Sequence, residues 1–265
     1  MLVNLRDVCS IAEQNNMAIA AVNSASLEAI RAAIEVAEET GYPIIIQHAE
    51  GHEGLIPLKY VSPIVTSLAE RSSAQICLNL DHCEHLSYAQ RALAEGFTGV
   101  MFDGSALPYE QNVEYSQRVS DMCVEYGAGL EQARDFVERT GLDILACSFG
   151  TVHGIYKGEP HLNYDVLRQI RQEVGNVPLV MHGGSGVSDD DYHKAIDAGI
   201  RKINYYTYGV KYAGEAVCGV VDEKRAQKSD AIVYWHDLTP VAYESFRDTF
   251  EHVVRVFANG ADPVA

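Results

Sequence analysis

Short apolar runs alternate along the chain with longer segments in which apolar residues recur every three or four positions. The runs are three to six residues long, which is typical of strands buried on both faces. The longer segments have the period of helices that bury one side. The sequence predicts strands at Ala18–Val22, Ile44–Gln47, Gln75–Leu80, Gly99–Phe102, Ala128–Leu130, Ile144–Ser148, Leu179–Met181 and Lys202–Asn204.

The amphipathic segments between these runs predict helices. They are Leu27–Thr40, Leu58–Arg71, Ser87–Ala94, Gln111–Tyr126, Gln132–Thr140, Tyr164–Val174 and Asp189–Ala198, with Leu5–Asn15 before the first strand and Gly209–Gln227 and Val241–Ala258 after the last. Strand–helix alternation favours right-handed βαβ units and a parallel sheet. Eight such strands predict an α/β fold of the (β/α)8 or TIM-barrel type with additional C-terminal helices. We find no linker, so we expect a single domain over residues 1–265.

Polar residues gather directly after the predicted strands. In a parallel barrel the functional groups lie at the carboxyl ends of the strands. Those ends carry Asn23-Ser24, Gln47-His48, Asp81-His82, Asp103-Gly104-Ser105, Glu131, Gly150-Thr151, His182-Gly183-Gly184-Ser185-Gly186, and Asn204 with Thr207 beyond it. The opposite ends carry Pro43, Gly99 and Pro178, which suit turns and strand entries. This asymmetry predicts an active site at the carboxyl end of the barrel.

Three histidines, His82, His153 and His182, each follow an apolar strand at this end. Three neutral imidazoles that leave a fourth position open are a common ligand set for catalytic zinc. Asp81 precedes the first of them and offers a carboxylate, and the turn after the last could hold a phosphate on backbone amides.

Each feature also has a structural interpretation. Asp81 and His82 could be a helix N-cap and a surface histidine, His153 a hydrogen-bonded loop residue, and the glycines plain turn chemistry. These interpretations weaken together, because all three histidines fall at one barrel face. His48 and His52 follow the second strand at the same face and receive no role. We expect the remaining histidines to be surface or structural: His85, His161, His193, His236 and His252.

Charge and cysteine content narrow the class of protein. The formal net charge of −17 argues against a nucleic-acid partner or an anionic membrane surface, since both need a basic face. No stretch approaches the roughly twenty apolar residues of a membrane span, and the N-terminus does not resemble a signal peptide. The six cysteines have no C-x-x-C spacing, which predicts reduced, buried thiols in a cytoplasmic protein.

Several segments together resemble the signature blocks of the class II, zinc-dependent ketose-bisphosphate aldolases. They are LNLDHCEH, GFTGVMFDGSALPYEQNV, GTVHGIYKGEP, PLVMHGGSGV and KINYYT, and the similarity covers about four-fifths of the chain in the family's order. The family has the (β/α)8 fold. The resemblance implies reversible cleavage of fructose 1,6-bisphosphate, or else tagatose 1,6-bisphosphate, to dihydroxyacetone phosphate and an aldehyde such as glyceraldehyde 3-phosphate. It further implies a homodimer or homotetramer.

The resemblance also assigns roles by position. It implies that His82, His153 and His182 bind Zn²⁺ and that Asp81 is the catalytic acid/base. Residues expected to hold the dihydroxyacetone-phosphate half are Asn23, Gly154, Gly183, Gly184, Ser185, Asn204 and Thr207, and some family members add a monovalent cation, Na⁺ or K⁺. Zinc would polarise the ketose carbonyl, and Asp81 could take the C4 hydroxyl proton.

Three departures from the family pattern stand out. The family follows strand five with V-E-x-E-L-G and a long loop that bears an acidic residue, whereas here GLE runs directly into QARDFVERTG, so that Glu131 matches only the first glutamate. We therefore expect a further loop of roughly twenty to thirty residues between Glu131 and Gln132. Strand two ends QHAEG, where relatives often have a hydroxyl residue near Ala49, and Tyr206 replaces a smaller or polar residue.

Three other functions remain open at this point. Lys202 could act as a Schiff-base nucleophile in a metal-independent aldolase, but the three histidines would then have no purpose. Alternatively, the chain is a non-catalytic sugar-phosphate-binding relative, or an aldolase for another phosphorylated or modified ketose.

Overall fold

The computed structural model describes residues 1–133, 140 and 142–264, with side chains outside residues 129–139. Its strands are β1 (Ile19–Asn23), β2 (Ile44–Ala49), β3 (Ile76–Cys83), β4 (Gly99–Phe102), β5 (Gly129–Ala133), β6 (Ile144–Cys147), β7 (Leu179–Met181) and β8 (Ile200–Tyr205). Each strand pairs in parallel with the next, and β8 pairs with β1, so that the sheet closes on itself. The predicted α/β class with a parallel sheet is confirmed.

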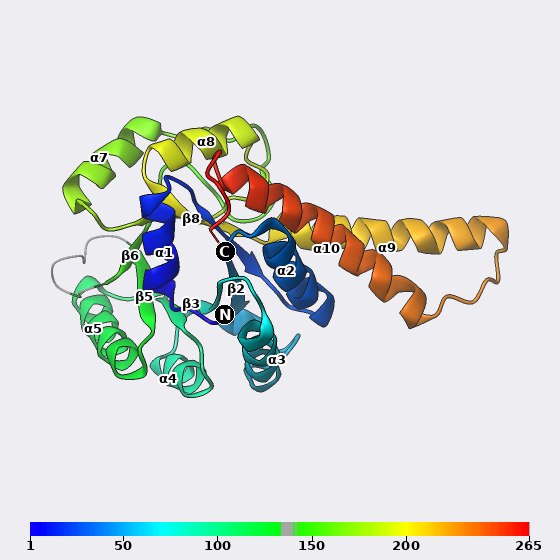
Figure 1. The fold of residues 1–265 in the computed structure, drawn as a ribbon, viewed down its shortest axis with the longest axis horizontal. Helices are drawn as coiled ribbons and strands as arrows, with labels where there is room; N and C mark the ends of the chain where they lie inside the picture. The colour runs from blue at the N-terminus through cyan, green and yellow to red at the C-terminus, as the bar shows by residue number, and fades with distance from the viewer. Residues whose placement is uncertain (134–139, 141, 265) are drawn as a thin grey trace.

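Helices surround this sheet (Figure 1). They are α1 (Leu5–Gln14), α2 (Leu27–Thr40), α3 (Leu58–Arg71), α4 (Leu86–Ala94), α5 (Tyr109–Tyr126), α7 (Tyr164–Val174), α8 (Asp189–Asp197), α9 (Thr207–Gln227) and α10 (Trp235–Phe257), with a short 3-10 turn η1 (Glu50–His52) after β2. The bounds of α2, α3 and α7 match the prediction at both ends. In the part of the chain that the structure describes, no helix is long and apolar enough to cross a membrane.

Two predictions around strand five need correction. Gln132 and Ala133 do not begin a helix, because they continue β5 and pair with Leu145 and Ala146 of β6. The rest of that predicted helix lies mostly outside the described residues. The expected loop between Glu131 and Gln132 is also wrong for this chain, since the two are consecutive residues of β5 and pair with consecutive residues of β6.

The amino end of the barrel is covered by α1, which contacts β1, β3, β4, β5 and β8. Its buried face consists of Leu5, Val8, Cys9 and Ala12. These side chains pack with inward-facing strand residues such as Ile45, Ile144 and Val180 in one apolar cluster. Burial of these apolar side chains stabilises α1 against the amino end of the barrel. The carboxyl end of the barrel is therefore the end at which a ligand can enter.

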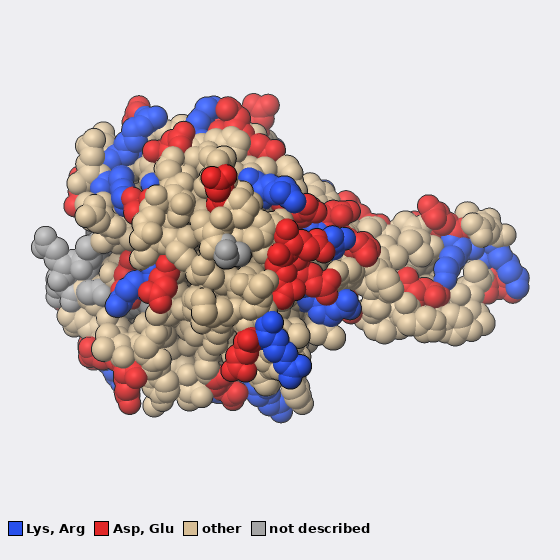
Figure 2. All heavy atoms as spheres, in the orientation of Figure 1, with Lys and Arg blue, Asp and Glu red and all other residues tan. Residues whose placement is uncertain are grey.

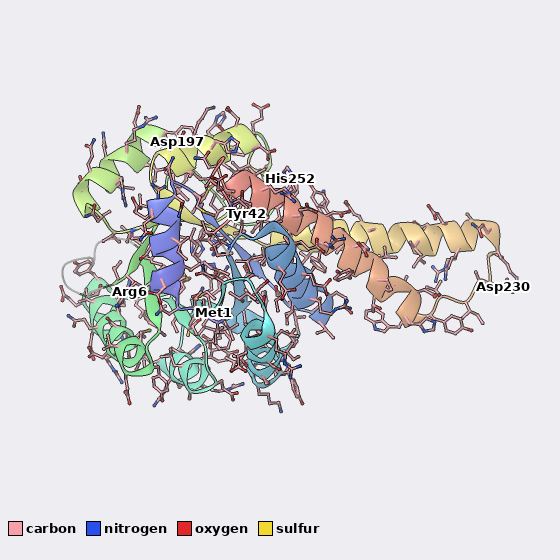
Figure 3. The ribbon with its side chains drawn as sticks, viewed as in Figure 1. Met1, Arg6, Tyr42, Asp197, Asp230 and His252 are labelled. Atoms are coloured by element: carbon pink, nitrogen blue, oxygen red, sulfur yellow. The ribbon has the colours of Figure 1, made fainter. Side chains whose placement is uncertain are left out.

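The last two helices form a projecting hairpin, which we call the arm (Figure 1). Only Gly209 and Ala213 of α9 are buried, whereas α10 packs against α2 and α9 through buried residues of its second half. Asp230 marks the tip of the arm in Figure 3, and His252 lies at its barrel end. Lys224 of α9 donates to Asp237 of α10 at 2.6 Å, which joins the two helices near the tip.

Acidic side chains are prominent on the face seen in Figure 2, where they gather over α2. All six cysteines are thiols, as expected, but Cys218 on α9 is exposed rather than buried.

Candidate active site

A ladder of buried polar side chains crosses the inside of the barrel. Asn23, Gln47 and Asn79 are neighbours in register on β1, β2 and β3. The Asn79 amide donates to Gln47 at 3.0 Å, and the Gln47 amide donates to Asn23 at 3.0 Å. Asn23 then donates through Nδ2 to Oδ2 of Asp81 at 2.8 Å.

The other carboxylate oxygen of Asp81 is held from β8. Asn204 donates to it through Nδ2 at 3.2 Å, and the Lys202 ammonium donates to the Asn204 carbonyl oxygen at 2.7 Å. Asp81 is 2% exposed and Lys202 is fully buried. The amides of Asn23 and Asn204 therefore fix the orientation of the buried Asp81 carboxylate. A carboxylate that transfers a proton to or from one particular atom needs such a fixed orientation.

The three histidines predicted as metal ligands converge above this ladder. His82 is the penultimate residue of β3 and lies at a register shift between β3 and β4, and its φ of 45° lies in the left-handed region, which is uncommon for residues other than glycine. Ring centroids are 5.0 Å apart for His82 and His182, 5.1 Å for His82 and His153, and 5.6 Å for His153 and His182. One ring nitrogen from each lies within 4.8 Å of the others, so the three could hold one ion.

The protein also orients one of these rings. Nδ1 of His82 lies 2.9 Å from Oδ2 of Asp103, at the end of β4. This hydrogen bond, together with two from Ser105, lowers the pKa of Asp103 despite its burial. A histidine that donates Nδ1–H to a carboxylate presents Nε2 to a metal. Partial desolvation and the neighbouring imidazoles lower the pKa of His153, although the residue is exposed, and this favours the neutral form that ligates metals.

The glycine turn after β7 depends on glycine for two reasons. Gly183 has a φ of 66°, and a Cβ there would lie 2.4 Å from the carbonyl oxygen of Val152. A Cβ on Gly184 would lie 2.8 Å from Ile203 and 2.9 Å from the backbone oxygen of Asn204. Ser185 then accepts the Tyr206 backbone N–H at 3.1 Å, so the turn is tied to the start of α9.

These groups surround one cavity of about 170 Å³, which we call the catalytic pocket. Its lining is Asn23, Ala49, His52, Asp81, His82, His153, Gly154, Gly183, Ser185, Asn204, Tyr206 and Thr207. Of the predicted site residues, only Gly184 and His182 are outside this lining, and His182 belongs to the histidine triad. Gly184 instead packs against β8. Lys202 also lies outside the lining, so its position does not favour a nucleophilic role.

Sequence reasoning assigned no role to His52 or Tyr206. The position of Tyr206 could have been predicted from the sequence. Successive side chains of a strand alternate in direction, so Tyr206, two positions after Asn204, is expected on the same side as Asn204. His52 follows the second strand at the same face, but its distance from the strand end does not indicate that the 3-10 turn η1 carries it to the pocket.

Two carboxylates anchor the turn that carries His52. Glu50 accepts the backbone N–H groups of Glu84 and His85 at 2.9 and 3.3 Å. Glu53 accepts from the Leu58 amide at 2.9 Å, from Tyr88 at 2.6 Å and from Arg91 at 2.8 Å. Burial would raise the pKa of Glu53, but these three hydrogen bonds outweigh it and lower the pKa to about 2.

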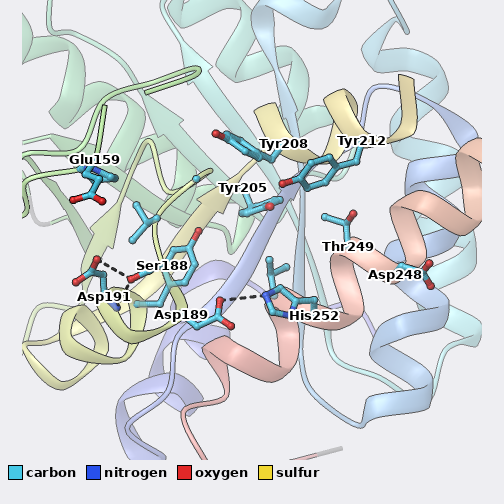
Figure 4. Close-up of a pocket in the computed structure, with 15 residues that line it drawn as sticks. Glu159, Ser188, Asp189, Asp191, Tyr205, Tyr208, Tyr212, Asp248, Thr249 and His252 are labelled. Atoms are coloured by element: carbon cyan, nitrogen blue, oxygen red, sulfur yellow. Dashed lines mark hydrogen bonds and ion pairs between the residues drawn. The ribbon is translucent and has the colours of Figure 1, made fainter. Parts of the chain in front are cut away.

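A second, larger cavity lies on the other side of the β7–α8 turn. We call it the tyrosine groove; it has a volume of about 820 Å³ and lies between that turn, α9 and α10 (Figure 4). Tyr205, Tyr208 and Tyr212 line it together with the carboxylates of Glu159, Asp189, Asp191 and Asp248. Asp189 lies 3.2 Å from Nε2 of His252. None of the three histidines of the triad lines this groove.

Comparison with known proteins places the whole chain in one group. The family model described as fructose-bisphosphate aldolase class-II matches residues 3–133 and 128–261. The two matches meet at β5, where the sequence departs from the family pattern.

Individual relatives agree with this match. A sulfofructosephosphate aldolase from Alkalicoccus urumqiensis is 35% identical over 215 residues, which are 71% of this chain and 75% of that protein. The crystal structure of the YdjI aldolase from Escherichia coli K12 has a TM-score of 0.87 at 30% identity, covering 99% of this chain and 98% of that one. Fructose-bisphosphate aldolase from Campylobacter jejuni has a TM-score of 0.84 at 20% identity over 97% and 95% of the two chains, and supports the fold alone.

Proposed function

The chain belongs to the class-II fructose-bisphosphate aldolase family and is an aldolase, a carbon–carbon lyase, and we propose that its catalytic pocket cleaves a phosphorylated ketose in a zinc-dependent, reversible aldol reaction. One observation carries this proposal: the histidine triad, the buried Asp81 carboxylate and the glycine turn meet in a single pocket. The proposal includes the complete (β/α)8 plan and one catalytic domain over residues 1–265.

The histidine triad fits zinc, because its nitrogens are close together and Asp103 fixes the orientation of His82. When bound, the ion supplies Lewis-acid polarisation of the ketose carbonyl. His82, His153 and His182 would hold it at the mouth of the barrel, beside the Asp81 carboxylate.

Asp81 takes the proton of the C4 hydroxyl as the C3–C4 bond breaks. The C4 oxygen then forms the aldehyde carbonyl, the electrons of the broken bond stay on the dihydroxyacetone-phosphate half, and a water molecule supplies the proton that this half takes up at C3. In the condensation direction Asp81 returns its proton to the new hydroxyl. Asn23 and Asn204 hold the carboxylate in place during both steps.

The phosphate is assigned to the glycine turn and its surroundings. The backbone amide of Gly183, with the hydroxyls of Ser185 and Thr207, would form a site of the kind found after barrel strands seven and eight, and Gly184 would support this turn against β8. Gly154, on the neighbouring loop after β6, also lines this pocket, and a Cβ there would meet nothing within 4 Å. A monovalent cation, Na⁺ or K⁺, beside this turn belongs to the same proposal.

The test is release of dihydroxyacetone phosphate from purified protein. The substrates to compare are fructose 1,6-bisphosphate, tagatose 1,6-bisphosphate and, from the name of the Alkalicoccus relative, sulfofructose phosphate. We expect cleavage of at least one of them, loss of activity with a chelator and recovery with zinc. Activity that resists the chelator, or that borohydride abolishes, would contradict a zinc mechanism.

We propose that the arm joins copies of the chain into a homodimer or homotetramer. Its tip exposes Ile232, Tyr234 and Trp235, which are 69%, 53% and 75% exposed. Apolar patches of this kind often mark interfaces between protein chains. Sedimentation at micromolar concentration should show an oligomer, and Trp235→Ser should shift it toward monomer, whereas a purely monomeric wild type would contradict the proposal.

A further inference from the structure

One wall of the catalytic pocket has no role in the reaction above, although it is built from two polar rings. We propose that His52 and Tyr206 bind the aldehyde half of the substrate, which lies beyond the carbon whose hydroxyl faces Asp81, and that they determine which aldehydes are accepted. This inference rests on the proposed aldol cleavage and names the part of the substrate that the mechanism leaves unassigned.

The strand order places this wall where the aldehyde half must lie. The phosphate site is on β7 and β8, and the triad is carried by the ends of β3, β6 and β7. Asp81 is the register partner of Ala49 on β2, and His52 follows Ala49 by three residues. A ketose anchored at the glycine turn, with its C4 hydroxyl at Asp81, directs its remaining carbons toward β2 and therefore toward His52.

His52 and Tyr206 also differ from the deeper polar groups of the pocket in their hydrogen bonding. Asn23, Asp81 and Asn204 bond one another. Among the residues that the structure describes, neither ring nitrogen of His52 nor the Tyr206 hydroxyl has a hydrogen-bond partner, and Nδ1 of His52 is buried. Polar groups at such sites are normally paired, so a ligand hydroxyl is the partner that this wall lacks.

The two rings are held in defined positions. Their centroids lie 5.0 Å apart with an interplanar angle of 41°. Glu50 and Glu53 anchor the turn on one side of the pair, and the Tyr206 backbone donates to Ser185 on the other. A wall fixed before the ligand arrives can discriminate between hydroxyl patterns, because little ordering cost is left for binding.

The chemistry of this wall is neutral. None of the described residues that line the pocket is a lysine or an arginine. Imidazole and phenol groups recognise hydroxyls by direction rather than anions by charge. The substrate class that fits is a ketose 1-phosphate whose aldehyde half is hydroxylated, with selectivity for those hydroxyls.

The experiment measures condensation of dihydroxyacetone phosphate with glyceraldehyde or with propanal, which has the same carbon chain without hydroxyls. The variants His52→Phe and Tyr206→Phe keep a ring and remove the polar group. Tyr208→Phe and His252→Phe are matched controls, since both residues line the tyrosine groove and not the catalytic pocket. Zinc content and the KM for dihydroxyacetone phosphate are measured for every variant.

We expect the glyceraldehyde-to-propanal ratio of kcat/KM to fall about fivefold in each test variant, as loss of one hydrogen bond predicts. The KM for dihydroxyacetone phosphate should stay within about twofold, and the controls should match the wild type. An unchanged ratio in both test variants would overturn the inference, even if overall rates fell. A zinc-loaded wild type that catalyses neither cleavage nor condensation would instead overturn the aldol proposal, and this inference with it.

Discussion

The catalytic pocket and the tyrosine groove lie on opposite sides of the same β7–α8 turn, and we assign the chemistry to the smaller of the two. The groove is almost five times as large, but Glu159, Asp189 and Asp248 stand exposed on its rim. In the pocket, by contrast, the polar side chains from β1, β3 and β8 are buried and hydrogen-bond to one another. Convergence of strand ends therefore marks the active site better than volume does.

The largest expected difference between variants of the two cavities is in metal content and cleavage activity. His82→Ala, His153→Ala or His182→Ala should abolish cleavage and remove zinc, because each takes one of three ligands from an open site. Metal analysis of the purified variants, beside His252→Ala from the groove, checks this. Full zinc occupancy in all three triad variants would show that these histidines do not bind the metal.

The next effect concerns the acid/base group. Asp81→Asn keeps the shape of the side chain and one of its two acceptor oxygens but cannot accept the C4 proton, so turnover should fall about 10²-fold or more with zinc retained. Steady-state cleavage rates measure this, with Asp189→Asn in the groove as the matched control. Unchanged turnover would exclude Asp81 from the mechanism.

A smaller effect is expected at the wall between the cavities. Gly183→Ala places a Cβ against the Val152 carbonyl oxygen and forces alanine into the left-handed region. That costs roughly 1–2 kcal/mol, which the turn would relieve by shifting, so we expect the KM for the phosphorylated ketose to rise about tenfold. Gly214→Ala on α9, where a Cβ would meet nothing within 4 Å, should leave KM unchanged. An unaltered KM in Gly183→Ala would argue against a phosphate site at this turn.

The last effect is on stability rather than on catalysis, and it concerns the pH dependence of His48 on β2, the strand that leads to His52. Burial lowers the pKa of His48 from 6.5 to about 4, whereas His252 in the groove is exposed. The unfolded chain therefore binds a proton at His48 below about pH 6.5, and the folded chain does not until about pH 4. Stability from this group is complete above pH 6.5 and falls through that window, by a few kcal/mol at most.

Denaturant unfolding at pH 7.5, 5.5 and 4.5 tests this pH dependence. His48→Leu should have a flatter profile than the wild type, and His252→Leu should not. Parallel profiles for wild type and His48→Leu would show that His48 is not the group responsible.

The fold was predictable where burial is one-sided and regular. The strands Gly99–Phe102 and Leu179–Met181 match at both ends. The start of α10 was predicted at Val241 but lies at Trp235, because the outer part of the arm is not buried against the barrel and carries no one-sided pattern; Trp235 is 75% exposed. At Gln132, pairing with β6 outweighs the helical pattern of the following residues.

The candidate site residues could be predicted from the sequence where they lie at or soon after the ends of strands. The strands deliver their terminal side chains to one rim, so His82, His153 and Asp81 could be read from strand ends. His52 could not, since its position depends on a 3-10 turn and on anchors such as Glu53 that lie elsewhere in the chain. The tyrosine groove was not foreseen either, because it needs the arm to pack beside the β7–α8 turn.

The two amides that hold Asp81 come from the strands that close the barrel. Asn23 precedes Asp81 by 58 residues and Asn204 follows it by 123. Contacts this far apart in sequence form late in folding, after loop-closure entropy has been overcome. A chain still leaving the ribosome, or one that has not joined β8 to β1, carries every catalytic side chain but lacks the environment that orients the carboxylate. Cleavage activity should therefore begin only when the barrel closes, which makes enzyme activity a report of completed folding in this protein.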